Sequence, residues 1–139
     1  LDWDVEIKTR NIDSVAPHSV GTMPAAGIVF TPYEQSIVHA KFQYQYRVEY
    51  QTTSETDSVV IEAELHDFST CPIQDLVRAS YEAAREEMKA NPGRDYYAGT
   101  GHGYFEKAKT GNSYSFRISP NAMKHIKSLA GNTFDKLFN

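Results

Sequence analysis

The clearest pattern in the chain is an alternation of apolar and polar side chains that runs through residues 38–51. The apolar set is Val38, Ala40, Phe42, Tyr44, Tyr46, Val48 and Tyr50, and the polar set is His39, Lys41, Gln43, Gln45, Arg47, Glu49 and Gln51. A period of two predicts an antiparallel β-strand with one face buried. At roughly 3.3 Å per residue such a strand would span about 45 Å, so we expect it to bend or to project beyond the domain.

A second alternating stretch, residues 57–68, follows a polar turn and predicts the partner strand of a hairpin. Its apolar set is Val59, Ile61, Ala63 and Leu65. The two apolar sets share one face only if the numbers of paired residues sum to an odd value. A hairpin that closes at Thr52 and Asp57 meets this condition, and it predicts that Arg47 lies opposite Glu62 on the polar face.

Two other segments have apolar residues at helical spacing. The first, residues 72–90, carries Ile73, Val77, Tyr81, Ala84 and Met88 on one side and ends before the "NPG" at 91–93. The second begins after Ser119 and Pro120 and carries Met123, Ile126, Ala130, Phe134 and Leu137. Each segment predicts an amphipathic helix that packs through its apolar stripe.

The remaining patterns complete the expected fold. Short strands are predicted at about 4–10 and 26–30, a second hairpin at 96–109 and 113–118, and a polar connection at 11–27. The elements predict an α+β fold in the order β-β-β-β-α-β-β-α, within a single domain of residues 1–139. We expect a curved antiparallel β-sheet of about six strands with two α-helices packed on one face.

The composition excludes several classes of protein. A net charge of −4 argues against a general polyanion binder, and a single cysteine excludes an intramolecular disulfide. No apolar run approaches the roughly 18 residues of a membrane span. The chain starts at Leu1, as a processed or exported chain would, although the sequence assigns no compartment. The five histidines show no metal-ligand spacing, and no motif indicates a cofactor.

Cys71 is the sharpest candidate for chemistry. If the first helix begins at Pro72, Cys71 is the N-cap, where unpaired amides and the helix dipole favour the thiolate. Cys–His hydrolases pair such a thiolate with a histidine. The candidate partners are His102, His66 and His39. In the alternative interpretation Cys71 is a small hydrophobic residue, and the glycine-rich run at 99–103 only permits a bulge or the close approach of another backbone.

Tyrosine is unusually frequent, with nine residues in the chain. A buried tyrosine needs a hydrogen-bond partner for its hydroxyl, so a plain core uses leucine and phenylalanine at lower cost. We therefore expect the tyrosines to lie in the core with partners, or to line a cavity or an interface. The candidate binding residues are Tyr44, Tyr46, Tyr50, Tyr96, Tyr97 and Tyr104.

Three functions are consistent with these patterns. The leading one is a non-enzymatic binding or assembly module that contacts a protein partner, or a second copy of itself, through the long hairpin and the tyrosines. The second is a small cysteine-dependent hydrolase with Cys71 as nucleophile and a histidine base. The third is a single-stranded nucleic-acid binder that stacks bases on tyrosines, which the acidic balance disfavours.

Overall fold

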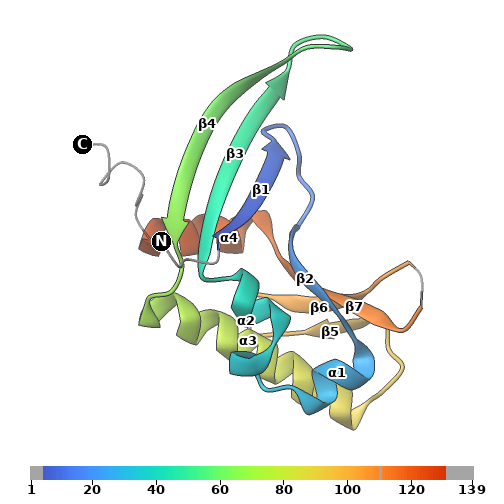
Figure 1. Ribbon diagram of the computed structural model, residues 1–139. Helices are drawn as coiled ribbons and strands as arrows, with labels where there is room; N and C mark the ends of the chain where they lie inside the picture. The colour runs from blue at the N-terminus through green and yellow to red at the C-terminus, as the bar shows by residue number, and fades with distance from the viewer. Residues whose placement is uncertain (1–4, 110, 131–139) are drawn as a thin grey trace.

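The computed structural model describes residues 5–109 and 111–130 and has an α+β fold with two β-sheets and four α-helices (Figure 1). In chain order the elements are β1 Val5–Asn11, β2 His18–Pro24, α1 Ala25–Phe30, the 3-10 helix η1 Tyr33–Gln35, α2 Ile37–Lys41, β3 Tyr44–Thr52, β4 Ser58–Asp67, α3 Cys71–Ala90, β5 Tyr96–Ala98, β6 Tyr104–Lys107, β7 Ser113–Ile118 and α4 Pro120–Ala130. The predicted fold class is confirmed. Phe134 and Leu137 of the second predicted helix lie outside the described residues.

The prediction of a single curved sheet with two helices is wrong, because the strands form two separate sheets. One has three strands in the order β1-β3-β4, and the other has four in the order β2-β7-β6-β5. β1 runs parallel to β3, and the other neighbouring strands are antiparallel. The β3–β4 hairpin projects away from the layer that α3 makes with the four-stranded sheet (Figure 1).

The prediction missed β2, which lies inside the supposed polar connection at 11–27. This strand contains a glycine and a proline, and its register shifts between Ser19 and Gly21. The shift places Val20 and Gly21 in consecutive buried positions, so no alternation remains to be detected.

Two predicted strand segments are helical instead. Residues 26–30 belong to α1, and the first part of the long alternating stretch forms α2. The Ser36 Oγ begins α2 by accepting a hydrogen bond from the His39 backbone N–H at 3.1 Å. Val38 and Phe42 are both fully buried, and their spacing of four residues fits one face of a helix as well as one face of a strand. The alternation alone therefore did not distinguish the two structures.

The core lies between α3 and the four-stranded sheet. The predicted stripe of Ile73, Val77, Tyr81, Ala84 and Met88 is buried along α3, which confirms that helix and its inner face. The Tyr81 ring meets the Phe105 ring edge-on at 5.4 Å between centroids, and Phe105 meets Phe116 of the neighbouring strand at 5.1 Å. These rings join α3 to the centre of the sheet.

The hairpin register differs from the prediction by two residues. Arg47 pairs with Glu64 rather than Glu62, and the register shifts between Glu49 and Tyr50. A bulge of this kind adds one residue to one strand and changes the pairing beyond it. Because the displacement below the bulge is two residues, the two apolar sets still share one face there, as predicted.

The Gln74 side chain joins α3 to both strands of the hairpin. Its Nε2 donates to the carbonyl oxygens of Phe42 and Phe68, each at 2.7 Å. Its Oε1 accepts from the Tyr33 hydroxyl at 2.7 Å and from Gln43 Nε2 at 3.3 Å. Both donors and the acceptor of this buried amide are therefore satisfied, as burial requires.

Replacing Gln74 with glutamate should destabilise the fold strongly. The substitution keeps the shape but turns a double donor into an acceptor that faces two carbonyl oxygens. We expect Gln74→Glu to lower the free energy of unfolding by about 3–5 kcal/mol in urea titrations at pH 7, because it leaves a buried charge uncompensated. Gln35→Glu, at an exposed position, should change it by less than about 0.5 kcal/mol. Equal effects would show that the amide does not hold the hairpin.

Candidate protein-contact surface

The three-stranded sheet has one apolar face and one charged face. On the apolar face the cross-strand rows are Val5–Tyr44–Asp67, Ile7–Tyr46–Leu65 and Thr9–Val48–Ala63. On the charged face the rows are Glu6–Gln45–His66, Lys8–Arg47–Glu64 and Arg10–Glu49–Glu62. Successive residues of a strand point to opposite faces, so the two sets are separated by the full thickness of the sheet.

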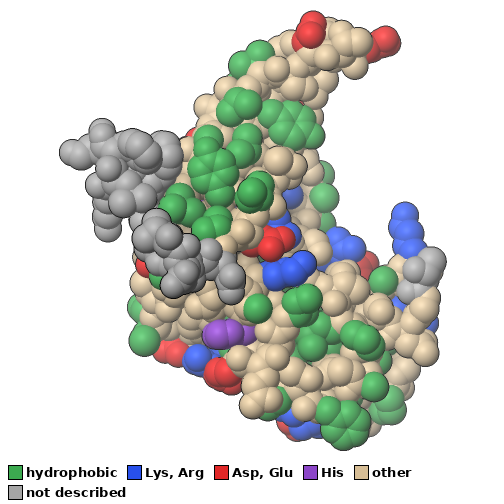
Figure 2. Space-filling view, viewed as in Figure 1, with side chains coloured by type: hydrophobic (Ala, Val, Ile, Leu, Met, Phe, Trp, Pro, Cys, Tyr) green, Lys and Arg blue, Asp and Glu red, His purple; other side chains and the backbone are tan. Residues whose placement is uncertain are grey.

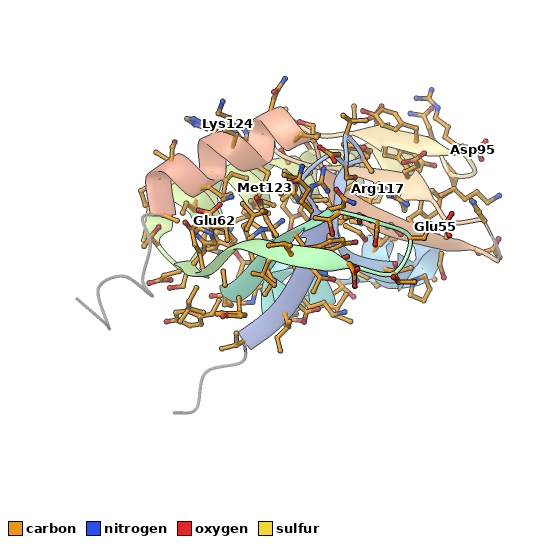
Figure 3. All side chains as sticks on the ribbon, turned by 90° about the horizontal axis from the view of Figure 1, so that it is seen from above. Glu55, Glu62, Asp95, Arg117, Met123 and Lys124 are labelled. Atoms are coloured by element: carbon orange, nitrogen blue, oxygen red, sulfur yellow. The ribbon has the colours of Figure 1, made fainter. Side chains whose placement is uncertain are left out.

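The charged face is the buried one, which reverses the predicted arrangement. Arg47 is only 5% exposed and Gln45 and His66 are equally buried, whereas Ile7 on the apolar face is 69% exposed. The helix α4 lies against the charged face, where Lys127 Nζ approaches Glu49 Oε1 at 3.7 Å. Figure 3 shows Met123 on the side of α4 that faces the strands.

The exposed face of the sheet carries a continuous set of large apolar side chains. Its exposed members are Val5, Ile7, Val60, which pairs with Tyr50, and Ile61 at the bulge. Figure 2 shows hydrophobic side chains gathered on this side of the hairpin. We call this set, together with the half-buried Tyr44, Tyr46, Val48, Tyr50 and Leu65, the outer face. Contiguous exposed apolar surface of this kind marks interaction sites in proteins.

The other three candidate binding tyrosines, Tyr96, Tyr97 and Tyr104, do not belong to the outer face. Tyr97 is fully buried, and its hydroxyl donates to the Asn91 carbonyl at 2.6 Å and accepts from the Arg94 backbone N–H at 3.0 Å, so this ring lies in the core with its hydroxyl paired. Tyr96 and Tyr104 lie in the four-stranded sheet with their ring centroids 5.1 Å apart and line a cavity of about 340 Å³.

The cavity beside Tyr96 and Tyr104 offers two rings for stacking but little positive charge. Arg117, which pairs with Tyr104 across the strands, has its Nε 3.3 Å from the Glu106 carboxylate. A single-stranded nucleic-acid site needs cations along the backbone as well as rings. This function therefore stays a prediction that the cavity does not strengthen.

Cys71 and His102 are not brought together. Cys71 is exposed at the first residue of α3, whereas the His102 backbone N–H donates to Ser80 Oγ at 3.1 Å. Ser80 lies nine residues further along α3, about 13 Å at roughly 1.5 Å per residue. The His102 ring instead lies 5.6 Å from the His125 ring. The geometry thus lends no support to a Cys71–His102 dyad.

The glycine-rich run at 99–103 packs closely against α3 and β7. Ser80 Oγ accepts from the backbone N–H groups of Thr100 and His102, both at 3.1 Å. A Cβ on Gly99 would lie 2.2 Å from the Gly103 carbonyl oxygen and 2.8 Å from Ser80 Cβ. The glycines therefore serve the close approach of backbone to backbone, which was one of the two interpretations of the run.

Arg47 of β3 and His18 of β2 form a polar contact between the two sheets. Arg47 Nη1 donates to Gln45 Oε1, and its Nη2 lies 2.7 Å from His18 Nδ1. Burial, and then the positive charges of Arg47, Arg10, Lys127 and Lys8, lower the pKa of His18 from 6.5 to about 3. The imidazole is therefore neutral at pH 7 and accepts a hydrogen bond from the guanidinium, which has only donors.

Comparisons with protein-family models and with curated proteins find no match to this chain. None of the helices described here has the length and apolarity needed to cross a bilayer. Within residues 5–109 and 111–130, no group of three or more His, Cys, Asp or Glu side chains is arranged to hold a metal ion.

Alanine substitutions at two glycines of the run 99–103 should lower the free energy of unfolding by very different amounts. Gly101 and Gly103 both have positive φ, of +103° and +154°, but only at Gly103 would a Cβ meet another residue, at 2.1 Å from Phe116 Cζ. We expect Gly103→Ala to cost more than about 3 kcal/mol and Gly101→Ala about 1–2 kcal/mol from backbone strain alone, in chemical unfolding. Similar losses at the two positions would contradict the close packing on Phe116.

The low pKa of His18 should make stability depend on pH. The unfolded chain takes up a proton at His18 near pH 6.5, whereas the folded protein does so only near pH 3. The free energy of unfolding should therefore fall as the pH is lowered from 6.5 towards 4. His18→Asn keeps an acceptor for Arg47 but cannot titrate, so urea unfolding should show a shallower fall for this variant. An unchanged slope would contradict the contact.

Proposed function

We propose that the protein is a non-enzymatic assembly module that binds a second copy of itself through the outer face of the three-stranded sheet. One observation carries the proposal: the apolar side of a strongly two-sided sheet is exposed while its charged side is buried. Burying an aliphatic side chain is worth about 1.5–3 kcal/mol. The exposed valines and isoleucines of the outer face therefore favour association with another apolar surface.

The charge distribution favours a second copy as the partner. In a twofold symmetric contact the same patch meets itself, so a charge near the twofold axis meets its own image. The rows of the outer face contain one charged residue, Asp67, which stands at the end of the face beside Val5 and Tyr44. Two copies can thus pack face to face, as stacked sheets do at about 10 Å, without opposing like charges at the centre.

The size of the face sets the expected strength. Three strands are about 14 Å wide, and ten residues of β4 extend about 33 Å. This surface is smaller than the roughly 800 Å² per partner of a standard interface. We therefore expect a reversible dimer that forms at micromolar or higher concentration.

Sedimentation equilibrium between about 10 µM and 0.5 mM tests this proposal. The average mass should rise with concentration from 15.7 kDa towards twice that value. Ile7→Lys should weaken the dimer at least about tenfold, because it places a charge in the apolar contact. Ile7 is well exposed, so the monomer should remain as stable as the wild type.

Phe30→Lys provides the matched control. Phe30 is also a large exposed hydrophobic residue, but it lies in α1, at the end of the molecule opposite the hairpin tip (Figure 1). This variant should dimerise like the wild type. Loss of the dimer in Phe30→Lys but not in Ile7→Lys would place the contact elsewhere. A wild-type protein that stays monomeric to about 0.5 mM would contradict self-association through the outer face.

A further inference from the structure

A cavity of about 210 Å³ opens on the other side of the three-stranded sheet from the outer face. The connection between β1 and β2 forms one wall, and the first turns of α4 form the opposite wall. Its charged and titratable lining residues are Arg10, His18, Glu49, Lys124 and Lys127. Three cations therefore surround this small space together with one carboxylate.

A fourth cation, Arg47, contacts the lining residue His18. Arg47 is 5% exposed, and its guanidinium contacts Gln45 and His18, neither of which carries a negative charge. No carboxylate oxygen of the described residues lies within 4.0 Å of it, and its buried Nε has no hydrogen-bond partner among them. Burial lowers the pKa of Arg47, and the negative charge of Glu49, which forms no ion pair with it within 4.0 Å, acts against this lowering. A buried guanidinium without a close counter-ion is stabilised by a further anion nearby.

The contact with Arg47 also determines whether the second ring nitrogen of His18, Nε2, is a hydrogen-bond donor or an acceptor. Its Nδ1 accepts from the guanidinium, so the neutral ring carries its proton on Nε2. The remaining polar atom of the ring is therefore a donor. His18 lines the cavity, and it adds a neutral hydrogen-bond donor to the cations around the space.

Two of the three cations that line the cavity are held in place by contacts. Arg10 Nη2 donates to the carbonyl oxygens of Ser14 and Ala16, at 3.1 and 2.6 Å. Lys127 is 3.7 Å from Glu49, whereas Lys124 stands exposed at the rim, on the side of α4 turned away from the strands (Figure 3). Fixed donors around a small space are the arrangement that recognises an oxyanion.

We propose that this cavity binds the phosphate group of a small phosphorylated ligand, with Arg10 and Lys127 in its wall, Lys124 at its rim and the charge of Arg47 beside His18. The volume supports a small ligand, because cavities for larger organic ligands span about 300–1,000 Å³. The positive end of α4 adds to the attraction, since the helix begins at the cavity with Pro120. The site is independent of the outer face.

The Lys127–Glu49 pair allows a test that separates binding from structure. Inorganic phosphate is titrated into the protein at constant ionic strength set with chloride, and backbone amide NMR signals are followed. We expect shifts at residues 10–18 and 119–127. Lys127→Gln should weaken phosphate binding about fivefold or more, whereas Glu49→Gln should strengthen it about threefold. Both substitutions break the same ion pair, so a purely structural role would move the affinity in the same direction.

Lys107→Gln is the control for net charge. Lys107 is an exposed lysine of β6 in the other sheet, and its replacement should change the affinity less than twofold. Equal effects of Lys107→Gln and Lys127→Gln would show a general charge effect and overturn the site. No phosphate-specific shift up to about 20 mM would also overturn it.

Two further ligands distinguish the source of the phosphate. Glycerol phosphate should displace inorganic phosphate and produce the same pattern of shifts, as a small phosphorylated ligand would. A single-stranded twelve-nucleotide DNA should bind no more tightly than glycerol phosphate. If the DNA binds much more tightly, with an affinity that falls steeply with salt, the ligand is a nucleic acid and the small-ligand proposal is wrong.

Discussion

The Gln74 amide is the contact on which the arrangement of the hairpin depends. Phe42 precedes β3 and Phe68 follows β4, and both carbonyls accept from the same amide nitrogen. Their rings also stack at 4.7 Å between centroids. The base of the hairpin is thus held at two points on α3, and α3 in turn is part of the main core. The hairpin can project from the body because its base is anchored in this way.

The orientation of the three-stranded sheet is unusual because the charged face is inside. Burial of an ionised group is costly, and well-packed apolar residues in its place are often more stable. Arg47 is nevertheless buried, and Gln45 and His18 satisfy two of its nitrogens. The chain keeps charged side chains of both signs on the face that α4 covers and apolar side chains outside, which leaves each face chemically suited to a different contact.

The sequence predicted the regular parts of this fold and missed the parts that long-range contacts decide. The stripe of α3 and the alternation of β3 and β4 were detectable, because many residues repeat one spacing. β2 was not, because its bulge interrupts the pattern at Ser19 and Gly21. The four-residue spacing of Val38 and Phe42 fits one face of a strand as well as one face of a helix. The structure is helical there, and the Ser36 side chain caps the helix.

The candidate site was only half predictable for a related reason. Alternation shows which residues of β3 share a face, and it assigned Tyr44, Tyr46 and Tyr50 correctly to one side. It does not show which face of the sheet is covered, because the covering helix, α4, comes much later in the chain, after β7. The cationic cavity left no signal at all, because Arg10, His18, Glu49 and Lys127 come from four different elements. Tyr97 could not be separated from its neighbour Tyr96 by composition, although one is buried and the other exposed.

Polar contacts, rather than apolar burial, explain why the three-stranded sheet keeps its charged face inside and its apolar face outside. A slip of β3 by one residue would carry Tyr46 to the inner side and Arg47 to solvent. That arrangement would bury more apolar surface, yet it would break the Arg47–His18 contact and move the Phe42 carbonyl away from Gln74. Each broken contact would leave a buried polar group unpaired, at a cost of about 1–3 kcal/mol. The bulge after Glu49 confines the irregularity of the hairpin to its tip, so the paired rows near the base keep one register.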